Sequence, residues 1–285
     1  MLQHTFCHLP AIGPQSEKKF WDQGIRSWKE FLQTSDPVLT RRQQEIYHPA
    51  IRNSFDHLQK NHPQFFAQRL ASAQHWRLYS EFRNSVAYLD IETTGLTVGE
   101  SEITTIAVYD GKKIFHYVNG INLQDFPEDI KKYSLLVTFC GKNFDVPFIQ
   151  AYFGIKLPHS HIDLRNVLRS LGYKGGLKKC EKEFGLDRKE LDGIDGLFAV
   201  LLWNEYIKNK NQHALDTLLA YNIEDVVNLE PLMVMTYNLK LKETPFGNTL
   251  NLSVPPRPAI PFQPHMPTVR NLLRQSRPFD PYARY

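Results

Sequence analysis

The sequence predicts an α/β fold in which helices flank a mixed sheet, with a small helical region before it and a proline-rich tail after it. Three observations predict this organisation: helical apolar spacing before residue 84, short β-rich runs from Val86 onward, and crowded prolines after residue 240. The expected units are therefore a helical region over 1–83, an α/β domain over 84–240 and a tail over 241–285.

The first unit is polar and aromatic, with few β-branched runs. From Gln64 to Leu78, apolar residues recur every three or four positions, which is typical of a helix. Residues 9–21 resemble a helix-hairpin-helix, a fold that holds phosphate through backbone amides, although Ala11 replaces the usual first glycine and only one hairpin is evident. A small packing module that touches no nucleic acid is an equally good interpretation.

The α/β domain begins with three β-rich runs, over 86–92, 102–109 and 113–118. Asp110-Gly111 is a hairpin signal between the last two, so an antiparallel meander is expected. A buried strand over 135–139 follows, then a helix that starts near Phe144. Further helical patterns cover 164–171, 177–184, 196–206 and 213–232. A meander followed by alternating strands and helices predicts a mixed sheet with helices on its faces.

The tail is rich in proline from about Glu243 onward. Proline lacks a backbone N–H and cannot continue a helix or pair in a central strand. We therefore expect a tail without a helix, which is extended, disordered or wrapped over the domain.

The bulk composition is that of an ordinary globular protein, with 42% hydrophobic and 22% charged residues. The net charge of +4 is compatible with a polyanionic partner but does not demand one. No apolar run approaches the roughly 18 residues that span a bilayer, and no secretory signal is visible, so a cytoplasmic protein without a membrane partner is expected. Cys7, Cys140 and Cys180 are widely spaced and are expected to be free thiols rather than zinc ligands.

Two acidic residues lie at the end of the first predicted strand. Asp90 and Glu92 are two positions apart, so the strand period directs both side chains to one face. Clustered carboxylates repel one another unless cations neutralise them, and oxygen ligands favour hard ions such as Mg²⁺ or Mn²⁺. A solvated strand end is the plain alternative for an Asp-x-Glu pair.

Two later elements carry further candidates. Asp145 follows the next buried strand and is expected to approach Asp90, although it could instead cap the helix that opens there. Tyr221 and Asp225 are four residues apart and share one face of a predicted helix. Glu224 is expected to point away from them into solvent.

Three segments carry a family resemblance. Residues 88–96, 138–148 and 221–226 occur in the order of the three motifs of the DEDDy exonucleases, within the ribonuclease-H-like superfamily, and are most similar to its YprB-like predicted exonuclease branch. The resemblance extends from about Tyr88 to Leu232. One departure is Cys140, which stands where the family usually has Asn before Gly-Lys.

The resemblance implies a ribonuclease-H-like fold and a 3′→5′ exonuclease that cuts single-stranded DNA or RNA at 3′ ends with two divalent ions, Mg²⁺ or Mn²⁺. Asp90 would bridge both ions, Glu92 and Asp225 would hold the ion on the nucleophile side, and Asp145 would reach the other ion largely through water. Tyr221 would orient the attacking water. The candidate substrate-binding residues are Thr93, Gly95, Leu96, Lys142, Asn143, Phe144 and Lys178.

Two other clusters have competing interpretations. His159, His161 and Asp163 have a spacing that suits a metal, but a structural role with Asp163 as a helix N-cap is favoured. Basic residues surround Gly175-Gly176 and are either a phosphate-contacting surface, which is slightly favoured, or an ordinary charged helix face. For the whole chain, a non-catalytic nucleic-acid-binding protein and a structure-specific endonuclease are the alternatives to an exonuclease.

Overall fold

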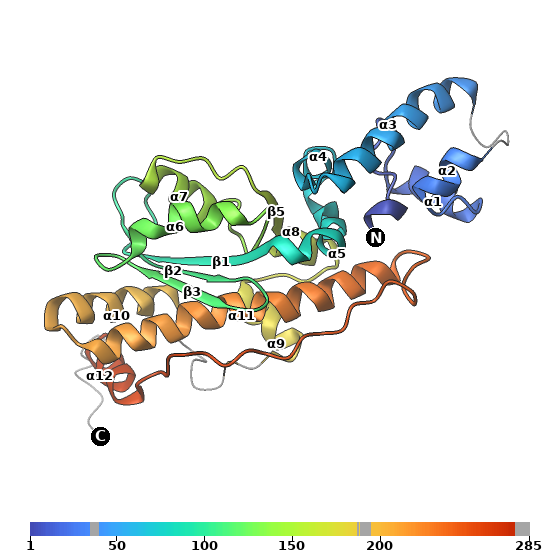
Figure 1. Ribbon diagram of the computed structural model, residues 1–285. Coiled ribbons are helices and arrows are strands. Elements are labelled where there is room, and N and C mark those ends of the chain that lie inside the picture. Colours follow the sequence, from blue (N-terminus) through green and yellow to red (C-terminus); the bar gives the residue numbers. More distant parts are fainter. Residues whose placement is uncertain (35–39, 187, 189–194, 277–285) are drawn as a thin grey trace.

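The computed structural model describes residues 1–34, 40–186, 188 and 195–276. Its centre is a five-stranded sheet in the order β3-β2-β1-β4-β5, with helices on both faces (Figure 1). The strands are β1 (Val86–Thr93), β2 (Ile103–Tyr109), β3 (Ile114–Val118), β4 (Leu135–Thr138) and β5 (Ser160–Asp163). The first three form the expected antiparallel meander, and β4 and β5 are parallel to β1. The predicted mixed α/β sheet is therefore confirmed.

Side chains along β1 alternate between two hydrophobic cores. Ala87, Leu89 and Ile91 lie in the core beneath α6 (Phe126–Asp129) and α7 (Asp145–Phe153). Val86 and Tyr88 lie in the larger core on the opposite face, with α10 (Gly196–Asn209) and α11 (Gln212–Lys242). Even-numbered residues of this strand therefore face the long helix α11, which runs beneath the sheet (Figure 1).

The remaining domain helices match their predicted positions within a few residues. They are α8 (Leu164–Ser170) and α9 (Leu177–Glu183). The long helix α11 extends ten residues beyond the predicted end at Leu232, because buried apolar positions continue through Tyr237 and Leu241.

The N-terminal region is helical and packs at one end of the domain (Figure 1). Its elements are η1 (Leu2–His4), α1 (Pro14–Asp22), α2 (Trp28–Gln33), α3 (Arg41–Gln59), α4 (Pro63–Ala67), η2 (Ser72–Leu78), α5 (Tyr79–Phe82) and η3 (Arg83–Ser85). A buried ion pair between Glu17 and Arg77 joins α1 to η2, with a closest distance of 2.7 Å. Before Ala11 the only helical turn is the three-residue η1, so the helix-hairpin-helix interpretation stays a prediction.

The helix expected from Gln64 to Leu78 is wrong as a single element. The chain leaves α4 after Ala67 and re-forms as the 3₁₀ segment η2. A ring nitrogen of His75 lies 3.0 Å from the carbonyl oxygens of both Ala67 and Leu70, so a side chain holds carbonyls that a continuous helix would bond to backbone amides.

The tail wraps along the domain, which was one of the three arrangements that the sequence left open. It runs back beside α11 (Figure 1), where Leu252 and Asn238 exchange two hydrogen bonds of 2.9 and 2.8 Å. The expectation that it holds no helix is wrong, because α12 spans Met266–Ser276. Pro267 sits in the first turn of α12, where its missing N–H costs no helical hydrogen bond.

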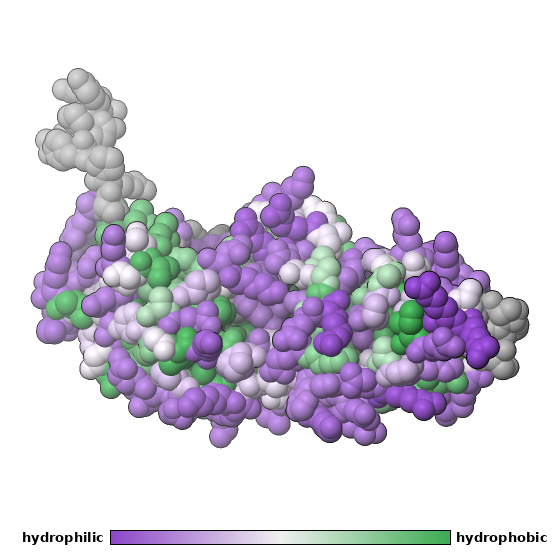
Figure 2. Space-filling view, turned by 90° about the horizontal axis from the view of Figure 1, so that it is seen from above, coloured by the Kyte–Doolittle hydropathy of each residue, from purple (hydrophilic) through white to green (hydrophobic). Residues whose placement is uncertain are grey.

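The surface is mainly hydrophilic on the face seen in Figure 2, with small scattered hydrophobic groups. Large apolar side chains such as Leu96 and Leu197 are exposed singly, at 82% and 74%. Within the described residues, no helix is long and apolar enough to cross a membrane.

Candidate active site

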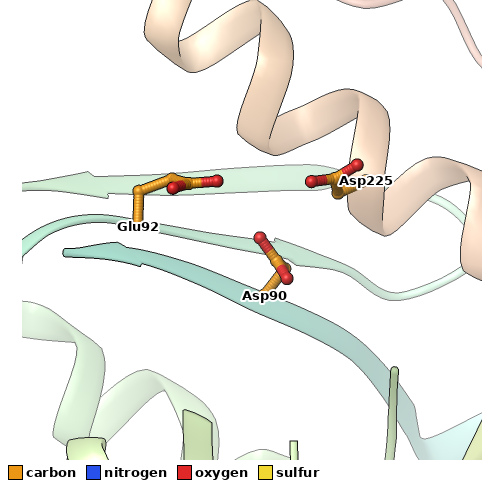
Figure 3. A group of neighbouring side chains, drawn as sticks. All are labelled: Asp90, Glu92 and Asp225. Atoms are coloured by element: carbon orange, nitrogen blue, oxygen red, sulfur yellow. The ribbon is translucent and has the colours of Figure 1, made fainter. Parts of the chain in front are cut away.

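Three carboxylates converge between the end of β1 and the middle of α11. Asp90, Glu92 and Asp225 each offer one carboxylate oxygen, and these three oxygens lie within 4.8 Å of one another. Figure 3 shows Glu92 and Asp225 pointing toward each other, with Asp90 directed between them. The strand period explains the arrangement, because even-numbered residues of β1 face α11. Asp90 and Glu92 therefore do not form the solvated strand end that was the alternative interpretation of this pair.

Asp145 lies beside this cluster at the first residue of α7. Its Oδ1 accepts a hydrogen bond from the backbone N–H of Ile91 at 3.3 Å, so the carboxylate is tied to β1 between the two acidic residues. Phe144, not Asp145, occupies the N-cap position. The expected approach to the first strand is thus present, and the alternative capping role is absent.

Burial and mutual repulsion dominate the electrostatics of the cluster. Burial, then the Asp225 and Asp145 carboxylates, raises the pKa of both Asp90 and Glu92 well above their usual range. Burial raises the pKa of Asp145 to about 7, against the effect of backbone hydrogen bonds that favour its charged form. A site of this kind binds protons or cations strongly.

Tyr221 and Lys178 form one wall of the site. Tyr221 is buried one helical turn before Asp225, and the Lys178 ammonium lies 4.7 Å from the centre of its ring. Burial and the nearby carboxylates raise the pKa of the Tyr221 hydroxyl far above its usual range. The hydroxyl therefore remains protonated and can donate a hydrogen bond, but it cannot serve as a base at neutral pH.

A buried arginine, Arg188, contacts the cluster, whereas the sequence interpretation grouped it with the basic residues near Gly175-Gly176. Arg188 forms an ion pair with Asp225 and donates to Glu181 from Nε at 2.5 Å and from Nη2 at 2.7 Å. Asn228 also donates to Glu181, at 2.9 Å. No spacing rule predicts the contacts of Arg188, because Glu181, Arg188 and Asp225 come from three different segments and meet only in the folded chain.

Asn222 is a second contact that sequence reasoning missed. Its Nδ2 donates to Asp90 Oδ2 at 2.8 Å, and its Oδ1 accepts from Thr105 on β2 at 3.0 Å. The amide thereby fixes the orientation of the Asp90 carboxylate. A signal existed, because Asn222 and Asp225 are three residues apart on the same predicted helix.

The expectation that Glu224 is solvated is wrong. Its side chain is buried and forms an ion pair with Arg257 of the C-terminal tail. The sequence offered no sign of this contact, since the tail reaches α11 only by folding back along it.

The predicted substrate-binding residues at the end of β1 and just after it differ in their exposure. Thr93 is buried and its hydroxyl donates to the Gly95 carbonyl at 2.6 Å. A Cβ at Gly95 would lie 2.7 Å from the Ser101 hydroxyl, so the Ser101 side chain packs closely on this turn. Leu96 is 82% exposed and is free to contact a substrate.

The predicted substrate-binding residues after β4 are Lys142, Asn143 and Phe144, and each has different surroundings. Lys142 Nζ lies 3.5 Å from Ser72 Oγ and 3.2 Å from His75 Nδ1, so it contacts η2 rather than the acidic cluster. Asn143 is exposed, and Phe144 packs on Phe148 with ring centres 5.5 Å apart.

The His159–Asp163 segment has structural partners. His159 Nε2 donates to the Ile130 carbonyl at 3.0 Å, and His161 is hydrogen-bonded to Thr138 at 2.8 Å. Asp163 caps α8 by accepting from the Arg165 N–H at 3.1 Å. These contacts favour the structural interpretation over a metal site.

The donor set of the acidic cluster suits a hard divalent cation. Asp90, Glu92 and Asp225 offer only carboxylate oxygens, with Asp145 alongside, and no thiol or imidazole is part of the group. Such ligands match Mg²⁺ and Mn²⁺. Repulsion among the buried carboxylates is also what a bound cation would relieve.

Comparison with known proteins identifies a family. The model of the RNase H superfamily matches residues 87–237, which is more than half of the chain. No curated protein matches significantly.

Several solved structures are similar at low identity. The family B DNA polymerase of Pyrobaculum calidifontis matches 55% of this chain at 16% identity and a TM-score of 0.41, and this chain covers 24% of the polymerase. Brucella melitensis NrnC matches 58% of this chain and is covered to 78%, at 18% identity and a TM-score of 0.39. NrnC has also been solved bound to pGG and with bound Mg²⁺. Likenesses this distant assign no activity.

Proposed function

Because the chain belongs to the RNase H superfamily, we propose that it is a metal-dependent 3′→5′ exonuclease that hydrolyses phosphodiester bonds of single-stranded DNA or RNA. The observation that carries the proposal is the meeting of Asp90, Glu92 and Asp225 within 4.8 Å, with Asp145 beside them. A protein that only binds nucleic acid has no need of repelling carboxylates in a buried pocket.

These four carboxylates would hold two divalent cations. When bound, such ions supply Lewis-acid stabilisation of charge on the phosphate and lower the pKa of water. Asn222 fixes the orientation of Asp90, and Arg188 that of Asp225. The ligands are therefore positioned before any substrate arrives, which lowers the cost of forming the reactive arrangement.

Tyr221 and Lys178 act on the substrate side. The protonated Tyr221 hydroxyl lies near the carboxylates and orients the attacking water as a hydrogen-bond donor or acceptor. Lys178 brings a positive charge over the Tyr221 ring, where it offsets part of the negative charge on Glu92. The exposed Leu96 offers an apolar contact for a base.

A cleavage assay tests the proposal. The full-length protein with Mg²⁺ or Mn²⁺ is expected to shorten a 5′-labelled single-stranded oligonucleotide stepwise from its 3′ end and to leave a circular single strand intact. Asp90→Asn should lose activity by about a thousandfold or more. Asp216→Asn, which changes an acid on the same helix outside the cluster, should retain it.

Two outcomes would contradict the proposal. Full activity of Asp90→Asn would remove the acidic cluster from the chemistry. Cutting of the circular strand would replace the exonuclease by a structure-specific endonuclease on the same fold.

A further inference from the structure

A basic cavity lies next to the acidic cluster. Its volume is about 510 Å³, and it is lined by the end of β4, the outer face of α8 and the loop before α9. The lining residues are Phe139, Cys140, Arg165, Arg169, Lys174, Gly175, Gly176 and Leu177.

Three cations face this cavity, and no carboxylate lines it. Arg169 and Lys174 are exposed, and within the described residues neither forms an ion pair. Arg165 donates from Nη1 to the Cys140 sulfur at 2.9 Å rather than to an acid. Gathered like charges repel one another, so the arrangement favours an anion between them.

The alternative interpretation was that the basic residues near Gly175-Gly176 form an ordinary charged helix face, neutralised by the acidic residues of α9. The contacts of those acidic residues do not support it at the cavity. Glu181 is buried against Arg188 on the far side of the helix. Glu183 lies 4.0 Å from Lys179. Neither carboxylate lines the cavity, so the basic residues there are not neutralised by their neighbours in sequence.

The walls of the cavity continue into the walls of the acidic site. On one side Leu177 is followed by Lys178, whose ammonium lies over Tyr221. On the other side the Val146 N–H bonds to the Gly141 carbonyl at 2.9 Å, which links the Cys140 turn to the start of the helix that carries Asp145. A strand bound at the carboxylates can therefore reach the cavity with a neighbouring phosphate.

We propose that this cavity binds a phosphate group of the nucleic-acid strand, adjacent to the phosphodiester that is cut. Arg169 and Lys174 contact the phosphate oxygens, and Arg165 supports them from the inner wall. Gly176 leaves room for a close approach, because it is exposed and a Cβ there would meet no atom within 4 Å. The inference rests on the proposed nuclease function and adds the place where the rest of the strand is held.

A binding experiment tests this without relying on catalysis. The full-length Asp90→Asn chain is titrated with a fluorescent single-stranded oligonucleotide in Mg²⁺, and anisotropy is measured over a range of salt concentrations. The same titration is run with Arg169→Gln/Lys174→Gln added, and with Lys112→Gln/Lys113→Gln as the matched control. The control removes the same charge from the exposed β2–β3 hairpin at the opposite edge of the sheet.

The cavity variant should bind on the order of tenfold or more weakly than its parent, which corresponds to two lost charge-assisted contacts. The slope of log K against log salt should fall by about 0.7, the value for one phosphate of a single strand. The control should keep both the affinity and the slope. The single variant Lys174→Gln, on an exposed loop, should show about half of the change in slope.

Equal affinity and slope for the cavity variant and the control would overturn the proposal, and so would failure of the parent to bind any oligonucleotide. Oligonucleotides with and without a 5′-phosphate distinguish the two sources of the anion. If the cavity variant loses affinity only for the 5′-phosphorylated oligonucleotide, the cavity binds a terminal phosphate. If it loses affinity equally for both oligonucleotides, the cavity binds an internal phosphodiester. Both results support the proposal. Failure of the nuclease proposal looks different, because the wild-type chain would then bind normally but cut nothing.

Discussion

The Arg188 guanidinium forms an ion pair with the Asp225 carboxylate, so a candidate metal ligand is held by a buried cation. The same guanidinium donates twice to Glu181, and both of these side chains are almost completely buried. Arg188 therefore fixes the position of Asp225 and compensates the charge of Glu181 at the same time. This ion pairing lowers the free-energy cost of burying the Asp225 and Glu181 carboxylates when no metal is bound.

Replacing Arg188 by methionine should destabilise the metal-free protein by about 3 kcal/mol, because two buried carboxylates lose their partner. Urea unfolding in EDTA measures the loss, and Mg²⁺ should recover part of it by neutralising Asp225. Adding Glu181→Gln should reduce the loss, since one orphaned charge disappears. Arg41→Met, in an exposed pair with Glu45, is the control and should change little. An unfolding free energy unchanged in Arg188→Met would show that the ion pair is not structural.

Sequence reasoning placed the sheet, the meander and the acidic residues because each depends on local periodicity. Asp90 and Glu92 share a strand face, and Tyr221 and Asp225 share a helical one, so their directions followed from the chain alone. These rules describe one element at a time. They do not say which distant side chain meets which, and that is why the role of Arg188 was missed.

The errors have the same cause. Glu224 was expected in solvent, since nothing near it in sequence covers that side of α11, yet Arg257 arrives from the tail. The helix predicted from Gln64 to Leu78 is interrupted where His75 binds carbonyls from another turn. In both cases a long-range contact overrode a correct local pattern.

The stability that Asp145 contributes to the metal-free protein should decrease as the pH rises toward about 7. In the folded state burial raises the pKa of Asp145 from 3.8 to about 7, so the folded chain binds a proton that the unfolded chain releases. The stabilisation is complete below the unfolded pKa near 4 and disappears above 7, with a slope of up to about 1.4 kcal/mol per pH unit between them. Asp90 and Glu92, whose pKa values are also raised, extend the decline to higher pH.

Thermal unfolding in EDTA from pH 5 to 9 measures this dependence. Asp145→Asn should flatten the part of the curve below pH 7. Saturating Mg²⁺ should reverse the trend, because cation binding displaces the protons and strengthens as the pH rises. An identical pH dependence of the melting temperature in the wild type and Asp145→Asn would mean that burial does not raise the pKa of Asp145.

Tyr221→Phe should lower kcat on the order of tenfold to a hundredfold while leaving metal affinity unchanged, because the hydroxyl orients water and contributes no charge. Burial and the carboxylates keep the hydroxyl protonated, so the alkaline side of the pH–rate profile should be the same in the variant and the wild type. Mn²⁺ titration and single-turnover cleavage make the measurements. Tyr206→Phe, on α10, is the control. A coincident loss of Mn²⁺ binding would assign Tyr221 to the metal site instead.

The Glu17–Arg77 pair should be a major polar link within the N-terminal region, where it joins α1 to η2. Glu17 accepts from Arg77 at 2.7 and 3.0 Å and from the backbone N–H groups of Phe6 and Cys7 at 2.6 and 3.1 Å. Glu17→Gln leaves the Arg77 charge buried without compensation, at a cost of about 3 kcal/mol.

Hydrogen exchange should show the effect of Glu17→Gln as faster exchange in α1 and η2, with the central sheet unaffected if the N-terminal region opens locally. The exposed Lys18–Asp22 pair on the same helix gives the matched control, and Asp22→Asn should cost less than about 1 kcal/mol. Equal effects of the two substitutions would contradict the argument, because burial is the property that distinguishes the pairs. If instead the sheet exchanges faster as well, the N-terminal helices and the domain unfold as one cooperative unit, and the ion pair stabilises the candidate active site from outside it.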